Sequence, residues 1–108
     1  MFPCGYNYTT QYELRSTERF DKWLAKIKDR QTHARIVRRI DKLVIGSFGD
    51  CKAISANLFE LRMFFGPGYR VYYTIRDREI IFLLAGGDKS TQSNDIEKAT
   101  ELLKSLEE

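Results

Sequence analysis

The stretch NLFELRMFFGPGYRVYYTIRDREIIFLLAGG, residues 57–87, decides the fold of this 108-residue chain. Apolar and polar side chains alternate along residues 57–63 and again along residues 69–76, the pattern of strands with one buried face. Residues 79–85 are almost continuously apolar, which is typical of a central strand. Two glycines and a proline at residues 66–68 turn the chain between the first two strands. The stretch therefore predicts an antiparallel meander of three strands.

Amphipathic helices are predicted on both sides of this meander. Upstream, apolar residues recur at helical spacing in two segments joined by a short break, and Gly46 is expected to end the second. A first strand is predicted over residues 8–14, and Ser93 is expected to cap a last helix. The result is an α+β fold of order β-α-α-β-β-β-α, an antiparallel sheet with a helical hairpin packed on one face. The apolar positions of the helix pair are Phe20, Trp23, Leu24 and Ile27, then Ile36, Ile40, Leu43 and Val44.

The length of the chain fits a single domain, residues 1–108, whose residues 1–7 are expected to be flexible. The sequence has no signal peptide pattern and no apolar segment long enough to span a bilayer, so we expect a cytoplasmic protein without a membrane partner. Neither cysteine lies in a CxxC or Cys/His pattern, and there is one histidine. We therefore expect no metal and no cofactor.

Positive charge is concentrated in one segment of the chain. Residues 15–52 hold eleven Lys and Arg against five Asp and Glu, a net charge of +6, and because the whole chain carries +3 the rest carries −3. Such asymmetry suits a polyanionic partner, and it makes Arg38, Lys42 and Lys52 candidates for substrate binding. Two ordinary helices with solvated basic faces would carry the same charge, and this alternative stays open.

Four side chains form a candidate catalytic site. Alternation places Arg62, Arg70 and Tyr72 on one face of neighbouring strands, and Lys89 follows the last strand, so we expect the three cations to meet at one edge of an open sheet face. The planar guanidinium of arginine and the ammonium of lysine bind phosphate oxygens, and they can stabilise negative charge that develops around phosphorus during a reaction. Tyr72 offers a ring for stacking or a hydroxyl near the scissile bond. Arginines on an outer sheet face are also common, so a structural role stays open.

Several motifs together resemble a known family. The Gp49-like "addiction module killer protein" branch of the RelE/ParE toxins, which includes HigB-type proteins, is similar to this chain over about residues 12–103. The resemblance rests on the combination of motifs, because none of them alone is specific. They are ELR at 60–62, GPGYRVYY at 66–73, GGDKSTQ at 86–92 with Asp95 and Ile96, and, upstream, FGD at 48–50 with Lys52.

The resemblance implies a toxin of a type II toxin–antitoxin system that acts as a metal-independent, ribosome-dependent mRNA endoribonuclease. It implies a cognate antitoxin, typically a helix-turn-helix protein that also represses the operon, so that DNA is contacted only through the antitoxin. Arg62, Arg70 and Lys89 match basic positions of the family. Several RelE enzymes carry a catalytic tyrosine in the C-terminal helix that is absent here. Either Tyr72 or Lys52 then takes its place, or the ribosome supplies more of the catalysis.

Two other functions stay open at this point. A ParE-like relative would inhibit gyrase without cutting RNA, and a decayed toxin would be an inactive RNA-binding or protein-binding module. Growth arrest with intact mRNA is expected of the first, and no arrest is expected of the second.

Overall fold

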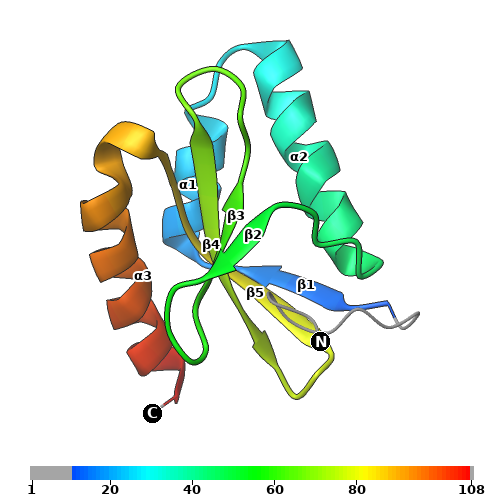
Figure 1. Cartoon of the computed structure of the whole chain (residues 1–108), viewed down its shortest axis with the longest axis vertical. Helices are drawn as coiled ribbons and strands as arrows, with labels where there is room; N and C mark the ends of the chain where they lie inside the picture. Colours follow the sequence, from blue (N-terminus) through cyan, green and yellow to red (C-terminus); the bar gives the residue numbers. More distant parts are fainter. Residues whose placement is uncertain (1–10, 108) are drawn as a thin grey trace.

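The computed structural model describes residues 11–107, which form a five-stranded sheet between helices (Figure 1). The predicted flexible segment 1–7 and residues 8–10 of the predicted strand 8–14 lie outside the described residues. The elements are β1 (Glu13–Ser16), α1 (Glu18–Ala25), α2 (Arg30–Val44), β2 (Cys51–Ala53), β3 (Phe59–Arg62), β4 (Tyr69–Arg76), β5 (Ile80–Asp88), the 3-10 turn η1 (Lys89–Thr91) and α3 (Gln92–Glu107).

The sheet has the strand order β1-β5-β4-β3-β2. β3, β4 and β5 form the predicted antiparallel meander, β2 extends it antiparallel to β3, and β1 pairs parallel with β5. The sequence did not predict β2, because three residues are too few to display an alternation. Its first residue, Cys51, is disulfide-bonded in the structure.

The helix ends follow local chemistry. Thr17 caps α1 by accepting a hydrogen bond from the backbone N–H of Phe20, and Asp29 caps α2 through Thr32. Gly46 follows α2 with a φ of 83°, which explains why glycine stands there. The prediction that Ser93 caps the last helix is wrong, because Asp88 caps η1 and the chain continues directly into α3.

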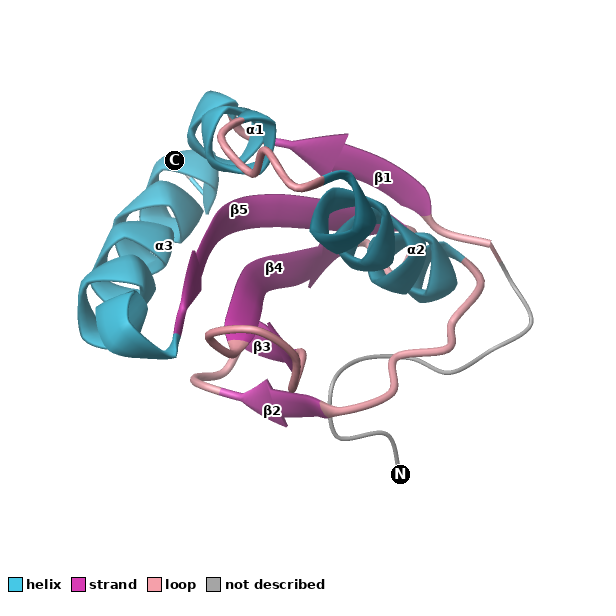
Figure 2. Cartoon of the chain, turned by 90° about the horizontal axis from the view of Figure 1, so that it is seen from above, coloured by secondary structure: helices cyan, strands magenta, loops and turns pink. Residues whose placement is uncertain are grey.

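Helices cover both faces of the sheet, and Figure 2 shows α2 and α3 on opposite sides of it. One core contains side chains of α1 and α2 packed on the sheet, which confirms that both helices pack on one face. The second core lies between α3 and the other face of β4 and β5. The first contains Phe20, Ile36, Ile40, Leu43, Leu61, Val71 and Tyr73, and the second contains Leu58, Tyr72, Leu84, Ala85, Ala99 and Leu103.

The prediction that this second face is open is wrong where α3 lies. Ala99 and Leu103 form an apolar stripe on α3 that needs an apolar surface, and Leu84 and Ala85 of β5 supply it. Tyr72 is therefore buried beneath the helix. No helix within residues 11–107 combines the length and the apolar character needed to cross a membrane.

Two glycines allow the helices to approach the end of β5. A Cβ atom on Gly86 would overlap the ring of Trp23, and one on Gly87 would overlap the carboxylate of Asp95. Burial raises the pKa of Asp95 above its ordinary value, and the hydroxyl of Thr91 donates a hydrogen bond to it. Packing therefore explains the two glycines near the end of β5, because no side chain fits at Gly86 or Gly87.

Replacing Gly87 with alanine should destabilise the fold. We expect Gly87→Ala to lower the free energy of unfolding by about 1–3 kcal/mol, the usual cost of overpacking, because the new methyl group must displace the buried carboxylate of Asp95. Urea denaturation followed by circular dichroism measures the change. Ser55→Ala, at an exposed position, is the control and should stay within about 0.5 kcal/mol of the wild type. Equal stability of the two variants would contradict this packing argument.

Candidate nucleic-acid interface

Two arginines face each other across the β3–β4 ladder. Arg62 and Arg70 are direct partners in the register, and Glu60 is the partner of Tyr72 two residues away, so all four lie on the same side of the sheet. Like charges at opposed positions repel each other. Each arginine therefore needs an acid close by, and the structure provides a different one for each.

Glu60 is the acid beside Arg70, and its side chain is completely buried. Its Oε2 accepts hydrogen bonds from the hydroxyl of Tyr72 at 3.0 Å and from Nε2 of Gln92 at 2.6 Å, and it lies 3.9 Å from Nε of Arg70. A buried carboxylate needs such donors, because it has lost its hydration. Glu60 thus joins β3, β4 and the first residue of α3 around one negative charge.

Tyr72 belongs to this buried network and not to an open surface. Burial, followed by the charge of Glu60, raises the pKa of its phenol well above the ordinary value. The ring is packed under α3, so the predicted stacking of Tyr72 on a base is wrong for this structure. Its hydroxyl donates a hydrogen bond to Glu60, the acid that lies beside Arg70.

Arg70 and Lys89 lie on either side of Gly68. A Cβ atom on that glycine would be 3.6 Å from Nη1 of Arg70 and 3.5 Å from Cβ of Lys89. Nη1 of Arg70 also donates to the carbonyl oxygen of Gly68 at 3.4 Å. Lys89 is exposed, and the neighbouring Asp88 is occupied by the cap of η1, where it accepts hydrogen bonds from Ser90. The two cations therefore share one edge, with Lys89 toward solvent.

Asp50 is the acid beside Arg62, and it also holds Arg39 of α2. Its Oδ1 accepts a hydrogen bond from Nη2 of Arg62 at 3.0 Å, and its carbonyl oxygen accepts one from Nη2 of Arg39 at 3.4 Å. The backbone N–H of Arg62 donates to the same carbonyl oxygen at 2.9 Å. One residue before β2 thus links the end of β3 to the middle of α2.

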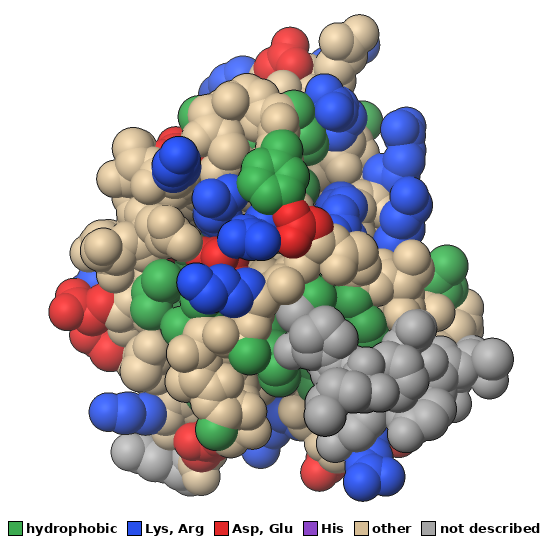
Figure 3. Space-filling model, viewed as in Figure 1, with side chains coloured by type: hydrophobic (Ala, Val, Ile, Leu, Met, Phe, Trp, Pro, Cys, Tyr) green, Lys and Arg blue, Asp and Glu red, His purple; other side chains and the backbone are tan. Residues whose placement is uncertain are grey.

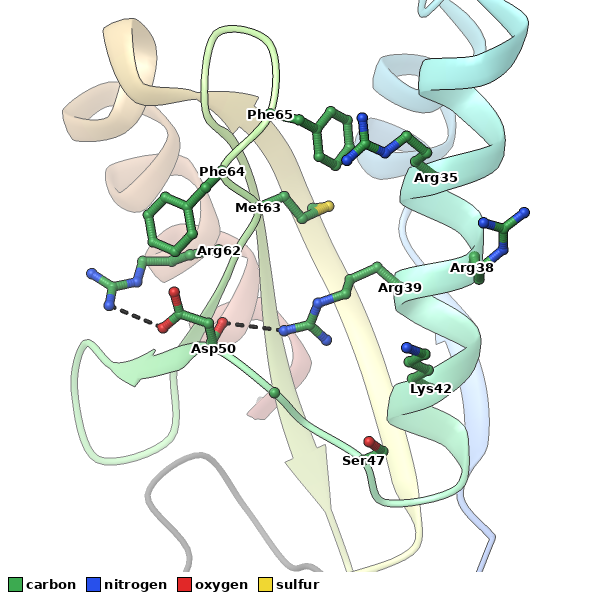
Figure 4. A pocket seen from close by; sticks show the side chains of 11 residues that line it. Arg35, Arg38, Arg39, Lys42, Ser47, Asp50, Arg62, Met63, Phe64 and Phe65 are labelled. Carbon is green, nitrogen blue, oxygen red and sulfur yellow. Dashed lines mark hydrogen bonds and ion pairs between the residues drawn. The ribbon is translucent and has the colours of Figure 1, made fainter.

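A pocket of about 430 Å³ lies between α2 and the segment that follows β3 (Figure 4). Arg39 points from the helix toward Asp50, whereas Arg38 points away from it at the outer rim. The guanidinium of Arg35 lies 3.8 Å from the centroid of the Phe65 ring, a cation–π contact. The lining is five cations, one acid and apolar side chains: Arg35, Arg38, Arg39, Lys42, Arg62, Asp50, Met63, Phe64 and Phe65, with Ser47 and Gly49.

The structure brings most of the predicted site residues into one basic region. Figure 3 shows Lys and Arg side chains gathered around acidic ones on the face between α3 and α2. Arg38 and Lys42 line the same pocket as Arg62, while Lys52 is exposed on β2 opposite Glu60. The roles predicted for Arg62, Arg70 and Lys89 in catalysis stay predictions.

Sequence reasoning missed five residues of this region. Arg35 and Arg39 continue the stripe of Arg38 and Lys42 at helical spacing, a signal that was readable in the sequence. The sequence placed Glu60 near the cations, but it carried no signal that Glu60 pairs with Gln92, because their hydrogen bond joins positions 32 residues apart. Phe64 lies between the predicted strand 57–63 and the turn at residues 66–68, and no pattern there indicated that it is 73% exposed.

Comparison with known proteins gives a consistent result. The family model of the phage-derived protein Gp49-like (DUF891) matches residues 22–104. An uncharacterized protein of Haemophilus influenzae is 44% identical over 94 residues, which cover 87% of this chain and 95% of that protein.

Two solved structures share the fold. A mutant of the Escherichia coli toxin RelE in its free state superposes with a TM-score of 0.70 at 16% identity, over 85% of this chain and 97% of that one. The toxin–antitoxin complex RelBE2 from Mycobacterium tuberculosis contains a chain with a TM-score of 0.64 at 20% identity, over 79% of this chain and 99% of that one. The chain therefore belongs to the phage-derived Gp49-like family, and its fold is that of the RelE toxins.

Proposed function

We propose that this protein is the toxin of a type II toxin–antitoxin system and that it cleaves mRNA on the ribosome. One observation carries the proposal beyond the likeness of fold. Arg62 is the ladder partner of Arg70 and also lines the pocket of α2, so cations run from that pocket across β3 and β4 to Lys89. A row of cations of this kind suits the phosphodiester backbone of a nucleic acid.

The proposed reaction is attack of a ribose 2′-hydroxyl on the adjacent phosphorus. The O2′–P bond forms, the P–O5′ bond breaks, and the proton of the 2′-hydroxyl leaves while the released O5′ gains one, so the products are a 2′,3′-cyclic phosphate and a 5′-hydroxyl. Arg70 and Lys89 stabilise the negative charge that develops on the phosphoryl oxygens. Arg62 holds a neighbouring phosphate, and the ribosome aligns the message.

The proposed binding partners, RNA and an antitoxin, share the same basic surface. Arg38, Lys42 and Lys52 contact the RNA backbone outside the reacting phosphate. In the absence of stress an antitoxin covers these cations, and its own helix-turn-helix domain, not this chain, binds DNA. Because the proposed target is the translating ribosome, the protein acts in the cytoplasm.

Controlled expression tests this function. Induction should arrest growth, and mapping of transcript ends should reveal cuts within translated messages that need ribosomes and disappear when the adjacent antitoxin gene is expressed. Arrest with intact mRNA and inhibited DNA supercoiling would instead identify a gyrase inhibitor of the ParE type. Absence of arrest would identify an inactive binding module.

Arg70→Ala should abolish toxicity. Removal of one fixed donor to a developing charge usually costs a hundredfold or more in rate, so we expect mRNA cleavage to fall by at least about a hundredfold. Arg76→Ala is a matched control, because Arg76 is exposed at the opposite end of the same strand. It should cleave at the wild-type rate. Circular dichroism of both variants checks that the fold is retained. Cleavage by folded Arg70→Ala at the rate of the control would contradict the assignment.

Tyr72→Phe should lower the rate of mRNA cleavage while the ring at position 72 stays buried. The ring stays packed under α3, but Glu60 loses one donor, so its hold on Arg70 loosens and the cleavage rate should drop by about tenfold, with a stability loss of about 1–2 kcal/mol. Tyr73→Phe is the control, since Tyr73 points into the core on the other face. Ribosome-dependent cleavage and thermal unfolding are measured for both. If the two variants lose activity in equal measure, the positioning role is wrong.

A further inference from the structure

Phe64 is a large apolar side chain that the fold itself does not use. It lies two residues beyond the end of β3, and the residues on both sides of it turn inward: Met63 is buried in the core and Phe65 is partly buried. Phe64 remains 73% exposed. An exposed aromatic ring gives up the stabilisation that burial would provide, so its free face is available to a ligand.

The residues on both sides of Phe64 are held in place, although its ring is exposed. Phe65 packs against Tyr69 with ring centroids 5.6 Å apart and carries the guanidinium of Arg35 on its ring. The backbone N–H of Met63 donates to the carbonyl oxygen of Tyr69 at 3.0 Å, and the guanidinium of Arg62 lies 5.7 Å from the Phe64 ring centroid. A ligand that stacks on Phe64 therefore orders little of the protein on binding.

The pocket beside this ring carries an excess of positive charge. Its lining has one acid, Asp50, and that carboxylate is already bound to Arg62. Lys42 and Arg38 form no ion pair with any residue in the range 11–107. Nε of Arg62 is buried and has no hydrogen-bond partner among the described residues. Lys42 and Arg38 are therefore not neutralised by an acid among the described residues, whereas Arg62 is paired with Asp50.

We propose that this pocket binds single-stranded RNA, with one unpaired base stacked on Phe64 and the adjoining phosphates held by Lys42 and Arg62. An aromatic face next to cations is the arrangement by which proteins grip single strands, since every base offers a π-face and every nucleotide a phosphate. A duplex hides its base faces and cannot stack in this way. The inference rests on RNA as the ligand of the proposed function, but it does not require cleavage.

Fluorescence anisotropy with a labelled single-stranded RNA of nine nucleotides tests the proposal. The full chain carries Arg70→Ala in every sample, so that toxicity does not limit its production. We expect the single strand to bind more tightly than the same sequence in a duplex, and Phe64→Ala to weaken single-strand binding by about tenfold, within the range for a lost stacked base. Phe64→Tyr should bind as before because the ring remains, whereas Phe64→Leu should resemble Phe64→Ala.

Two further comparisons separate stacking from charge. Lys42→Ala should reduce the slope of log affinity against log salt concentration by about 0.7, the contribution of one phosphate contact on a single strand, while Phe64→Ala should leave the slope unchanged. Ile45→Ala, at an exposed apolar position outside the pocket lining, is the matched control and should bind like the parent. Circular dichroism checks the fold of each variant. The three Phe64 variants differ only at one exposed position, so their RNA affinities can be compared directly.

The outcomes that overturn the inference are distinct from failure of the proposed function. Equal affinity for single strand and duplex would contradict the inference. So would a Phe64→Leu variant that binds as tightly as the parent with Phe64. So would a Phe64→Ala variant that binds RNA normally but loses its complex with the antitoxin, because the ring would then be a protein-docking site. If no RNA binds while induced wild type still cuts mRNA, the inference fails and the toxin function stands. If RNA binds as expected but induction of the wild type causes no growth arrest, the inference stands and the toxin function fails.

Discussion

The buried carboxylate of Glu60 sets the arrangement of the side chains around it. A charge without hydration is tolerated only where donors and cations surround it, and here they come from three separate elements. Tyr72 reaches it from β4, Gln92 from the start of α3, and Arg70 approaches it to 3.9 Å. Loss of the correct packing of any of these elements would take one partner away from the acid. The acid therefore ties the position of Arg70 to the integrity of the fold.

The same constraint explains how two opposed arginines are compatible with a stable sheet. Arg62 and Arg70 are ladder partners, and each has its own acid, Asp50 for the first and Glu60 for the second. Asp50 binds Nη2 of Arg62, and Glu60 lies 3.9 Å from Nε of Arg70. Nε of both arginines is buried and has no hydrogen-bond partner among the residues that the structure describes. A phosphate arriving at this edge meets cations that are already fixed in position, which is the condition for electrostatic stabilisation without reorganisation.

The proposed function divides into two tasks over neighbouring parts of one surface. Arg70 and Lys89 lie at the edge around Gly68, where a reacting phosphate would be held. The pocket of α2 and the ring of Phe64 lie beyond Arg62, where the strand that continues from that phosphate would be gripped. Arg62 belongs to both, because it ends β3 and its side chain turns toward Asp50. A nuclease that works on a flexible single strand needs both a fixed reacting phosphate and a fixed neighbour.

The sequence by itself determined the meander of β3, β4 and β5, the two helices that precede it, and the shared side of Arg62, Arg70 and Tyr72, because periods of two and of about 3.6 residues state which side chains share a face. It did not reveal that α3 covers part of that face, that Glu60 is buried, or that Phe64 is left in solvent. Only the tertiary structure decided these points. Which distant apolar stripe packs on a given face, and which acid pairs with which cation, depends on contacts between segments far apart in the chain, and local periodicity carries no information about such contacts.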